Sequence, residues 1–288
     1  MLLAVVCALL SSLLYALASV LQHHAARAEP ADQSLRLGLL TRLLHRPLFV
    51  IGIICDGLAY VLQFVALGHA SLVLVQPLLV CGLLFALPLG AWLEGTRMKR
   101  QDWVGAVLIV AGLAVFLVVA SPGRGTTDVD SWLQLCAFTG LAAAALVLLA
   151  RGRTARARAG LLAGAAGLVY GLTAALTKSV AHLLSIGIGH LLASWELYVL
   201  VGAGVVGMVL AQSAFQAGPL DASLPVLTVV DPVVSIIIGA VAFSEGIRTG
   251  AVATPLEIAG LVAMTGGVFV LSRAEAVHAM HSEAAEPL

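Results

Sequence analysis

Two aspartates in long apolar runs are the residues of this sequence best placed to do chemistry. Asp56 lies in the run Leu48–Leu67, and Asp231 lies in the run Ala222–Phe243. A carboxylate inside a membrane-spanning segment is costly to bury and is a functional candidate by default. Each aspartate lies roughly ten residues into its segment, which is about 15 Å, or half of a ~30 Å hydrocarbon core. Such a group could exchange protons or balance a bound cation.

Polar side chains recur at helical spacing around both aspartates and in other apolar segments. Residues three, four or seven positions apart share one face of a helix. Such faces on several helices would converge on a polar cavity; for the neutral side chains, hydrogen bonds that only hold helices together are the competing interpretation. The stripes are Asp56, Tyr60 and Gln63; Thr228, Asp231 and Ser235; Tyr15, Ser19 and Gln22; Tyr170, Thr173 and Thr177; and Gln212 with Gln216, while Gln76 is a further candidate.

Two prolines directly follow candidate residues: Pro77 follows Gln76, and Pro232 follows Asp231. A proline inside a membrane helix frees a backbone carbonyl, which neighbouring groups must satisfy. We therefore expect a bend in both helices, with the freed carbonyls facing the cavity or the bend serving packing alone.

A divalent cation is one possible occupant of such a cavity. Mg²⁺ requires oxygen ligands and is commonly held by one or two carboxylates. Asp56 and Asp231, with amide oxygens, could supply them. A proton and Mg²⁺ are thus both candidates for the transported or coupling ion, and no other cofactor is expected.

The elements that carry these residues must be membrane helices. The chain is 61% hydrophobic and 10% charged, whereas soluble domains are about 45–50% apolar and about 25% charged. Its mean hydropathy is +1.06. A soluble enzyme, a nucleic-acid binder and a disordered regulator are excluded. The sequence has no HExxH, GxSxG or phosphate-loop motif and no CxxC pair, so we expect neither an enzyme nor a structural metal site.

Long apolar segments of about 20 residues predict nine membrane-spanning helices. All four Trp residues lie at their ends, where an aromatic belt is expected. The segment Gln33–Arg46 is amphipathic and is predicted to lie along the membrane surface. The predicted spans are Leu2–Ala26, Leu48–Leu67, Ser71–Leu93, Trp103–Ala120, Trp132–Ala150, Ala159–Leu184, Trp195–Ala217, Ala222–Phe243 and Leu256–Leu271.

The cations between these spans predict the orientation. Alternate loops on one side hold twelve Arg and Lys residues, and the other side holds only Arg124 and Arg248. Since cytoplasmic loops carry the excess of positive charge, we expect the N-terminus outside and the C-terminus in the cytoplasm of a bacterial plasma (inner) membrane. Lys178, the remaining cation, is expected to snorkel to the outer surface, with pairing to a midplane aspartate as the alternative. The acids at span ends, Glu94, Glu196, Glu245 and Glu257, are expected to be solvated.

The two halves of the chain resemble each other. The segment from Tyr15 to Gln22 matches that from Tyr170 to Thr177 at an offset of 155, and Gly105 and Gly112 match Gly260 and Gly267 at the same offset. Helices one to four thus correspond to six to nine, with opposite directions across the membrane. Such inverted repeats are typical of secondary transporters, whose sites lie near the midplane between the halves.

These observations predict an all-α polytopic membrane protein of about nine helices, arranged as an inverted 4+1+4 repeat. Residues 1–120 are the first four-helix repeat, and residues 121–158 are a connector helix with an Arg-rich cytoplasmic loop. Residues 159–273 are the second, inverted repeat, and residues 274–288 are a short cytoplasmic tail.

The unit that ends in Gly105-Ala-Val-Leu-Ile-Val-Ala-Gly112, preceded by Glu94-Gly-Thr-Arg97, resembles the drug/metabolite transporter superfamily. EamA-type exporters and small multidrug resistance proteins share such a helix. The nine spans, the missing helix of the first repeat and the acid in the second helix more closely resemble the NIPA-like branch, which is associated with magnesium transport. The second half, from Gln212 to Pro232, more closely resembles EamA exporters, and the NIPA pattern has no clear counterpart of Asp231. The resemblance implies a transporter and leaves the substrate open.

The sequence therefore favours a secondary transporter that moves a small solute by alternating access. A Mg²⁺ or other divalent cation transporter is the alternative, and a non-transporting membrane scaffold subunit is the alternative from another class. The expected partners are the lipid bilayer and a small-molecule or ion substrate, with no nucleic acid, in a monomer or a homodimer. A transporter predicts a water-accessible cavity lined by the polar stripes, whereas a scaffold predicts that the stripes are packed dry.

Overall fold

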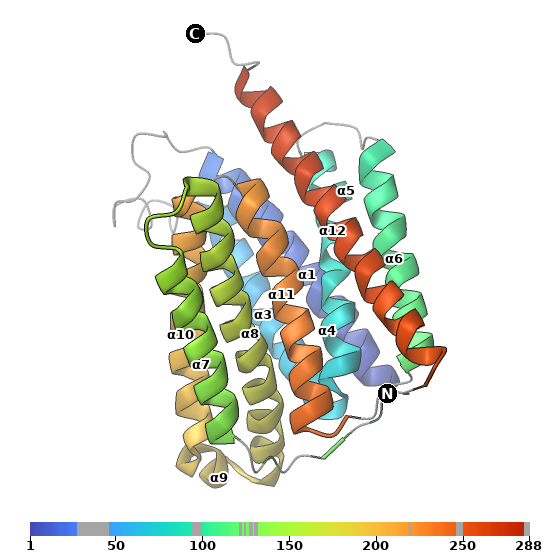
Figure 1. Cartoon of the computed structure of the whole chain (residues 1–288), viewed down its shortest axis with the longest axis vertical. Coiled ribbons are helices and arrows are strands. Elements are labelled where there is room, and N and C mark those ends of the chain that lie inside the picture. Colours follow the sequence, from blue (N-terminus) through green and yellow to red (C-terminus); the bar gives the residue numbers. More distant parts are fainter. Residues whose placement is uncertain are drawn as a thin grey trace.

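The computed structural model shows a bundle of helices (Figure 1) and describes residues 1–27, 46–93, 100–120, 123, 125, 126, 129, 132–218, 220–245 and 250–284. The helices are α1 (Leu2–Arg27), α3 (Pro47–His69), α4 (Leu72–Val80), α5 (Gly82–Leu93), α6 (Arg100–Ala120), α7 (Trp132–Leu149), α8 (Ala155–Ile186), α9 (Ile188–Ala193), α10 (Trp195–Ala217), α11 (Leu220–Ala242) and α12 (Ala253–Ala284).

Eight helical segments of the described chain are long and apolar enough to cross a membrane, with α4 and α5 together forming one of them. The sequence prediction of a polytopic helical membrane protein is confirmed at this level. The one predicted span that is not among these eight is Ala222–Phe243, which corresponds to α11; its 23 residues include the shorter apolar stretch Val226–Ala242. The helix α12 continues to Ala284, so the first part of the predicted tail is helical. Most of the predicted surface segment Gln33–Arg46 lies outside the described residues.

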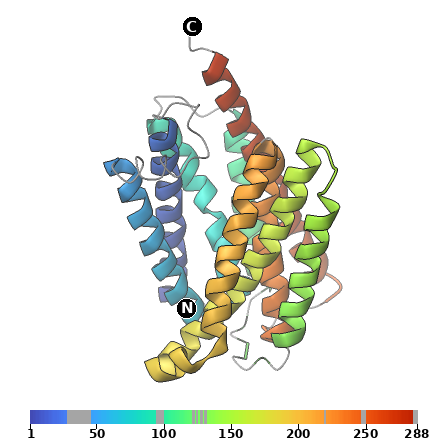
Figure 2. The same ribbon diagram turned by 90° about the vertical axis from the view of Figure 1, so that its left-hand side faces the viewer.

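The helix α8 occupies the middle of the bundle and is buried over most of its length. It packs against α7, α10 and α11, while α1 packs against α3 (Figure 2). Large apolar side chains such as Val118, Leu133 and Val241 stay exposed on the outer helices. In lipid such a surface requires no cover, because the surrounding acyl chains are as apolar as the side chains.

Small residues set the closest helix contacts, as expected where lipid removes the hydrophobic drive for helix association. A methyl group on Gly171 of α8 would lie 2.6 Å from Val234 Cγ1 of α11, and one on Gly167 would lie 2.7 Å from Val230 Cβ. The contacts advance in the same direction along both helices, so α8 and α11 run parallel.

The helices α6 and α12 cross through two glycine pairs. A methyl group on Gly112 would lie 2.5 Å from the Gly260 carbonyl oxygen, and one on Gly267 would lie 2.7 Å from the Gly105 carbonyl oxygen. Because residue numbers at the contacts rise along one helix as they fall along the other, α6 and α12 are antiparallel.

The two predicted proline bends differ. The third predicted span is broken at Cys81 into α4, which contains Pro77, and α5. The helix α11 instead continues through Pro232 to Ala242. The break lets Gly82 approach α1, where a methyl group on Gly82 would lie 3.2 Å from the Ser12 carbonyl oxygen.

The described chain begins and ends at opposite ends of the bundle: α1 starts at one end, and α12 finishes at the other (Figure 1). We call the end where α1 starts the N-terminal end. All four Trp residues lie in the first or last turn of a helix, as predicted, and Trp92, Trp103 and Trp195 are exposed. Trp132 is buried instead, with edge contacts to Trp195 and Phe243 at ring-centroid distances of 5.9 and 6.0 Å.

Candidate functional site

The first part of the candidate site is the contact between α1 and α3. The Tyr15 hydroxyl donates a hydrogen bond to Gln63 Oε1 at 2.9 Å, and the Ser11 hydroxyl donates to the Ala59 carbonyl at 2.7 Å. These bonds join the two helices along the face on which Asp56 lies, half-buried. The stripes predicted on α1 and α3 are therefore brought together.

A second contact links α3 to α8. The Tyr60 hydroxyl lies 3.2 Å from Thr177 Oγ1, and Thr177 Oγ1 donates to the Thr173 carbonyl at 2.7 Å. Since a threonine hydroxyl has one proton, the Tyr60 hydroxyl is the donor in its contact with Thr177. Residues 117 positions apart in the sequence are thereby joined across the middle of the bundle.

The third part of the site is the middle of α11. Asp231 is half-buried, and the Ser235 hydroxyl donates to Asp231 Oδ1 at 3.3 Å. Gly167 lets α8 approach so closely that a methyl group there would lie 3.1 Å from the Asp231 backbone nitrogen. Tyr170, one helical turn farther along α8, is within electrostatic range of Asp231. Its ring packs over Gly207 of α10, where a methyl group would lie 2.7 Å from Tyr170 Cε1.

Tyr15 connects these three parts. It lies within electrostatic range of Asp56, Tyr60 and Asp231, so α1, α3 and α11 converge on one region beside α8. We call this group the polar cluster. Its members are Tyr15, Asp56, Tyr60, Gln63, Tyr170, Thr177, Asp231 and Ser235.

The other predicted site residues lie elsewhere or are not described. Gln76 is buried on α4, and its Nε2 has no hydrogen-bond partner among the described residues. Thr228 lines a mainly apolar pocket between α4, α11 and α12 that also includes Pro77 and Pro232. Gln212 is exposed on α10, and the side chains of Gln22 and Gln216 lie outside the described part of the chain.

The acidic and polar groups of the cluster are oxygen donors. Within the described residues, no group of three or more His, Cys, Asp and Glu side chains is positioned to hold a metal ion. The oxygen donors that the polar cluster offers are the carboxylates of Asp56 and Asp231 and the neighbouring hydroxyl and amide oxygens.

The structure contains a second group of charged residues that was not predicted from the sequence. Lys178 of α8 forms a buried ion pair with Glu245, which follows α11. The Glu245 carboxylate also accepts hydrogen bonds from the backbone N–H groups of Leu72 and Val73, at 2.8 and 2.9 Å. Lys178 Nζ lies 4.5 Å from the centre of the Phe243 ring. We call Lys178, Phe243, Glu245 and the first turn of α4 the clamp.

The clamp corrects two predictions. Lys178 neither snorkels to the surface nor pairs with a midplane aspartate, and Glu245 is 2% exposed rather than solvated. The physical reason is mutual compensation, because a buried charge is tolerated when a partner and hydrogen bonds satisfy it. Glu257 is likewise buried on α12, contrary to the prediction, and Glu196 is half-buried. The sequence did contain one signal for this pair: Lys178 is the one Lys or Arg residue inside a predicted span, so a buried partner could have been expected.

The fold and the site thus define a helical membrane protein with charged groups buried inside the bundle. The chain belongs to the same family as an uncharacterized protein of Corynebacterium glutamicum, to which it is 34% identical over 247 residues, covering 85% of this chain and 86% of that protein. No family model and no solved structure matches the chain.

Proposed function

We propose that the protein is a secondary transporter of the drug/metabolite transporter superfamily, related to its EamA and NIPA-like branches. It moves a small solute by alternating access between two inverted four-helix repeats. The observation that carries this proposal is the polar cluster, because helices of both halves contribute to it. Asp56 is the tenth of 23 residues in α3, and Asp231 is the twelfth of 23 in α11, so both carboxylates lie at mid-helix.

The packing supports the inverted repeat. In the proposed correspondence α1 matches α8, α3 matches α10, the α4–α5 pair matches α11, and α6 matches α12. The contact of α1 with α3 then has its counterpart in α8 with α10, and that of α1 with α4 and α5 in α8 with α11. Such paired contacts are what two repeats related by a pseudo-two-fold axis would make.

The glycine pairs of α6 and α12 give the sharper support. In sequence Gly105 corresponds to Gly260 and Gly112 to Gly267. In space Gly105 contacts Gly267, and Gly112 contacts Gly260. A two-fold axis between two elements exchanges partners in this way, because residue i then contacts j and j contacts i.

The chemistry of the cluster favours a proton or a cation as the species that is bound. Its members are two carboxylates, three phenols, two aliphatic hydroxyls and one amide, with no Lys or Arg among them. The Ser235 hydroxyl on Asp231 carries no charge, so a cation would compensate the Asp231 carboxylate and protonation would neutralise it. The specific candidate is a small cationic solute or a solute exchanged for protons. A divalent cation is the second candidate, favoured by Tyr15 lying within electrostatic range of both aspartates.

Transport by purified protein in proteoliposomes tests the function. The assay follows uptake of Mg²⁺, Mn²⁺ and a panel of small organic cations under an imposed pH gradient. We expect Asp231→Asn to abolish uptake and Asp56→Asn to reduce it by a similar or smaller factor, since both changes keep the side-chain size and remove the charge. Glu196→Gln, at the start of α10, is the matched control and should retain uptake.

Three results would change or narrow this proposal. Normal uptake by Asp231→Asn would assign that residue to helix packing. Uptake of only one class of solute would decide between divalent cations and organic cations as the substrate. An absence of uptake of every solute, with the wild-type protein folded in the vesicles, would favour a scaffold subunit.

The orientation belongs to the same proposal: the N-terminus lies outside, and the C-terminus lies in the cytoplasm of a plasma membrane. The asymmetry of the loop cations supports it. A reporter fused after Leu288 should be active only in its cytoplasmic form, and a tag before Met1 should react with a membrane-impermeant reagent on intact cells. A cytoplasmic N-terminal tag would contradict the orientation, and two termini on the same side of the membrane would also contradict the inverted pairing of the halves.

A further inference from the structure

We infer that the clamp is the gate that closes the polar cluster off from the N-terminal end of the bundle. The inference rests on the proposed transport function, and it assigns a moving part to residues far from the aspartates in the sequence.

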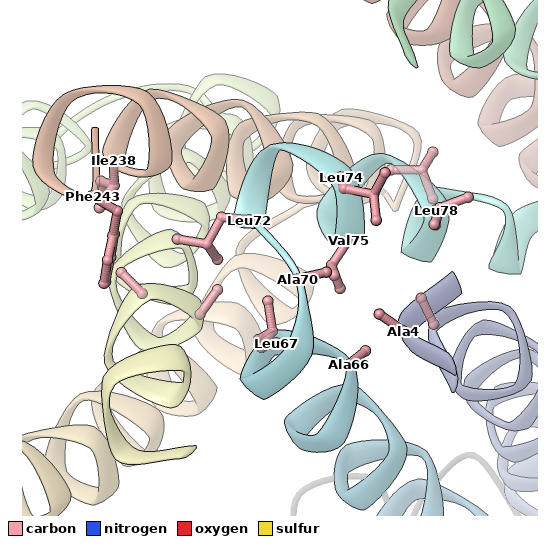
Figure 3. Close-up of a cluster of buried hydrophobic side chains, with 14 of the residues drawn as sticks. Ala4, Ala66, Leu67, Ala70, Leu72, Leu74, Val75, Leu78, Ile238 and Phe243 are labelled. Atoms are coloured by element: carbon pink, nitrogen blue, oxygen red, sulfur yellow. The ribbon is translucent and has the colours of Figure 1, made fainter. Parts of the chain in front are cut away.

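The clamp joins segments that alternating access must separate. Lys178 and Glu245 belong to the second half of the chain, and the Leu72 and Val73 N–H groups belong to the first. Figure 3 shows Leu72 on the side of α4 that faces Ile238 and Phe243. One carboxylate thus holds a lysine of α8 and the first turn of α4 at the same time. Separation of the halves at this end must break these bonds.

The Glu245 hydrogen bonds are strong when the clamp is closed, and bonds to water can replace them when it opens. Hydrogen bonds between a carboxylate and backbone N–H groups are charge-assisted, and the first turn of a helix favours negative charge. Leu72 is the first residue of α4, and Glu245 lies three residues after the end of α11, so the clamp sits near the end of both helices. If this end opens, water can hydrate both charges, and the desolvation penalty of the buried pair is removed.

A second connection closes the same end. The Thr126 backbone N–H donates to the Phe243 carbonyl at 2.6 Å, and its hydroxyl lies 3.2 Å from the same oxygen. The neighbouring Gly125 has a positive φ of 67°, a conformation that glycine adopts without strain. Thr126, which lies between α6 and α7 in the sequence, is thereby tied to the clamp.

The clamp is adjacent to the polar cluster along α8. Thr177 contacts Tyr60 in the cluster, and Lys178, the next residue, contacts Glu245 in the clamp. Successive residues of a helix point about 100° apart, so one turn of α8 faces both groups. A shift of α8 on solute or proton binding would therefore act on the clamp directly.

Chemical labelling of a buried position tests the closure. The four native cysteines are replaced by alanine, and Val75→Cys is introduced one turn into α4 from the clamp, where the wild-type side chain is fully buried. The clamp is neutralised by Lys178→Met with Glu245→Gln, a pair of changes that leaves no unpaired charge. The control is Glu257→Gln, which removes a buried carboxylate outside the clamp.

We expect a soluble maleimide to label Val75→Cys about tenfold faster or more when the clamp is neutralised, within the range that conformational coupling commonly gives. The control should leave the rate unchanged. An unchanged rate in a folded, clamp-neutral protein would show that Lys178 and Glu245 are a static staple and would overturn the inference.

A cross-link tests the same gate without touching the clamp. A Cβ atom on Gly68 of α3 would lie 3.3 Å from Ala181 Cβ of α8, one turn beyond Lys178, which is close to the separation in a disulfide. Gly68→Cys with Ala181→Cys should form a disulfide that stops uptake, and reduction should restore it. The control is Ser12→Cys with Gly82→Cys, a pair within the first half whose Cβ separation is 3.8 Å.

The results distinguish the two proposals. Continued uptake by the oxidised Gly68–Ala181 variant, or failure of that disulfide to form, would overturn the gate while leaving the transport function standing. No uptake by the wild-type protein, with labelling still dependent on the clamp, would overturn the transport function while the closure stands.

Discussion

The polar cluster and the clamp both hold carboxylates inside the bundle, but the groups that contact Glu245 differ from the group that contacts Asp231. Glu245 has a lysine and two backbone N–H groups, all within the hydrogen-bonded clamp. The bond described for Asp231 comes from a neutral hydroxyl, at the longer distance of 3.3 Å. A carboxylate compensated by a permanent cation holds a structure together, whereas one that faces neutral groups can bind and release a proton or a cation.

Lys178→Met should give the largest loss of stability, because it leaves the Glu245 carboxylate buried without its cation. Breaking one side of a buried ion pair costs about 3–5 kcal/mol. We expect a correspondingly lower unfolding temperature in detergent for Lys178→Met than for the wild type.

The matched control is the double change Lys178→Met with Glu245→Gln, which removes both charges and should recover most of the lost stability. Asp231→Asn should not lower stability in this way, since it removes a carboxylate from neutral surroundings. Equal destabilisation by the single and double changes would contradict the view of the clamp as a compensated pair.

Thr177→Val should have a smaller effect on stability and a specific effect on coupling. It removes the acceptor of the Tyr60 hydroxyl while keeping the side-chain shape, and interhelical hydrogen bonds in membranes are worth about 0.6 kcal/mol on average. Because Thr177 is adjacent to Lys178, we expect uptake to fall more than stability does. The measurements are the unfolding temperature and the initial rate of uptake.

Thr173→Val is the control for this change. Thr173 donates to the Tyr170 carbonyl within α8, so its loss removes a hydrogen bond of the same kind without breaking a link between helices. Equal uptake by Thr177→Val and the wild type would separate the clamp from the cluster and weaken the proposed coupling through α8.

Much of the fold could be predicted from the sequence. The predicted span Trp195–Ala217 coincides with α10, and Trp103–Ala120 differs from α6 by three residues at its start. Apolar length, breakers and helix-end residues are local signals, and a bilayer of fixed thickness translates them into helices of fixed length. The α3 face with Asp56 and Gln63 and the α11 face with Asp231 and Ser235 were also predictable, because helical spacing places polar residues on one side of a helix.

The partners of those faces could not be predicted from the same signals. The sequence placed Thr228 and Ser235 on one face with Asp231, but the structure turns Thr228 toward the pocket with Pro77 and Pro232. It also gave Pro77 and Pro232 the same role, whereas the chain breaks after Pro77 and continues as a helix past Pro232. Gly82, next to the break, contacts Ser12 of α1, and no local pattern encodes that contact.

The sequence by itself determined that this chain is a polytopic helical membrane protein with two carboxylates at mid-helix. Hydropathy and helical spacing depend only on residues close in the sequence, so the helices and their polar faces can be predicted without the tertiary structure. Only the tertiary structure decided that Lys178 and Glu245, 67 positions apart, pair inside the bundle, and that Glu245 caps a helix beginning 173 positions earlier. Burial of a charge depends on which distant groups the packing brings within hydrogen-bonding distance, because that contact alone offsets the cost of removing the charge from water.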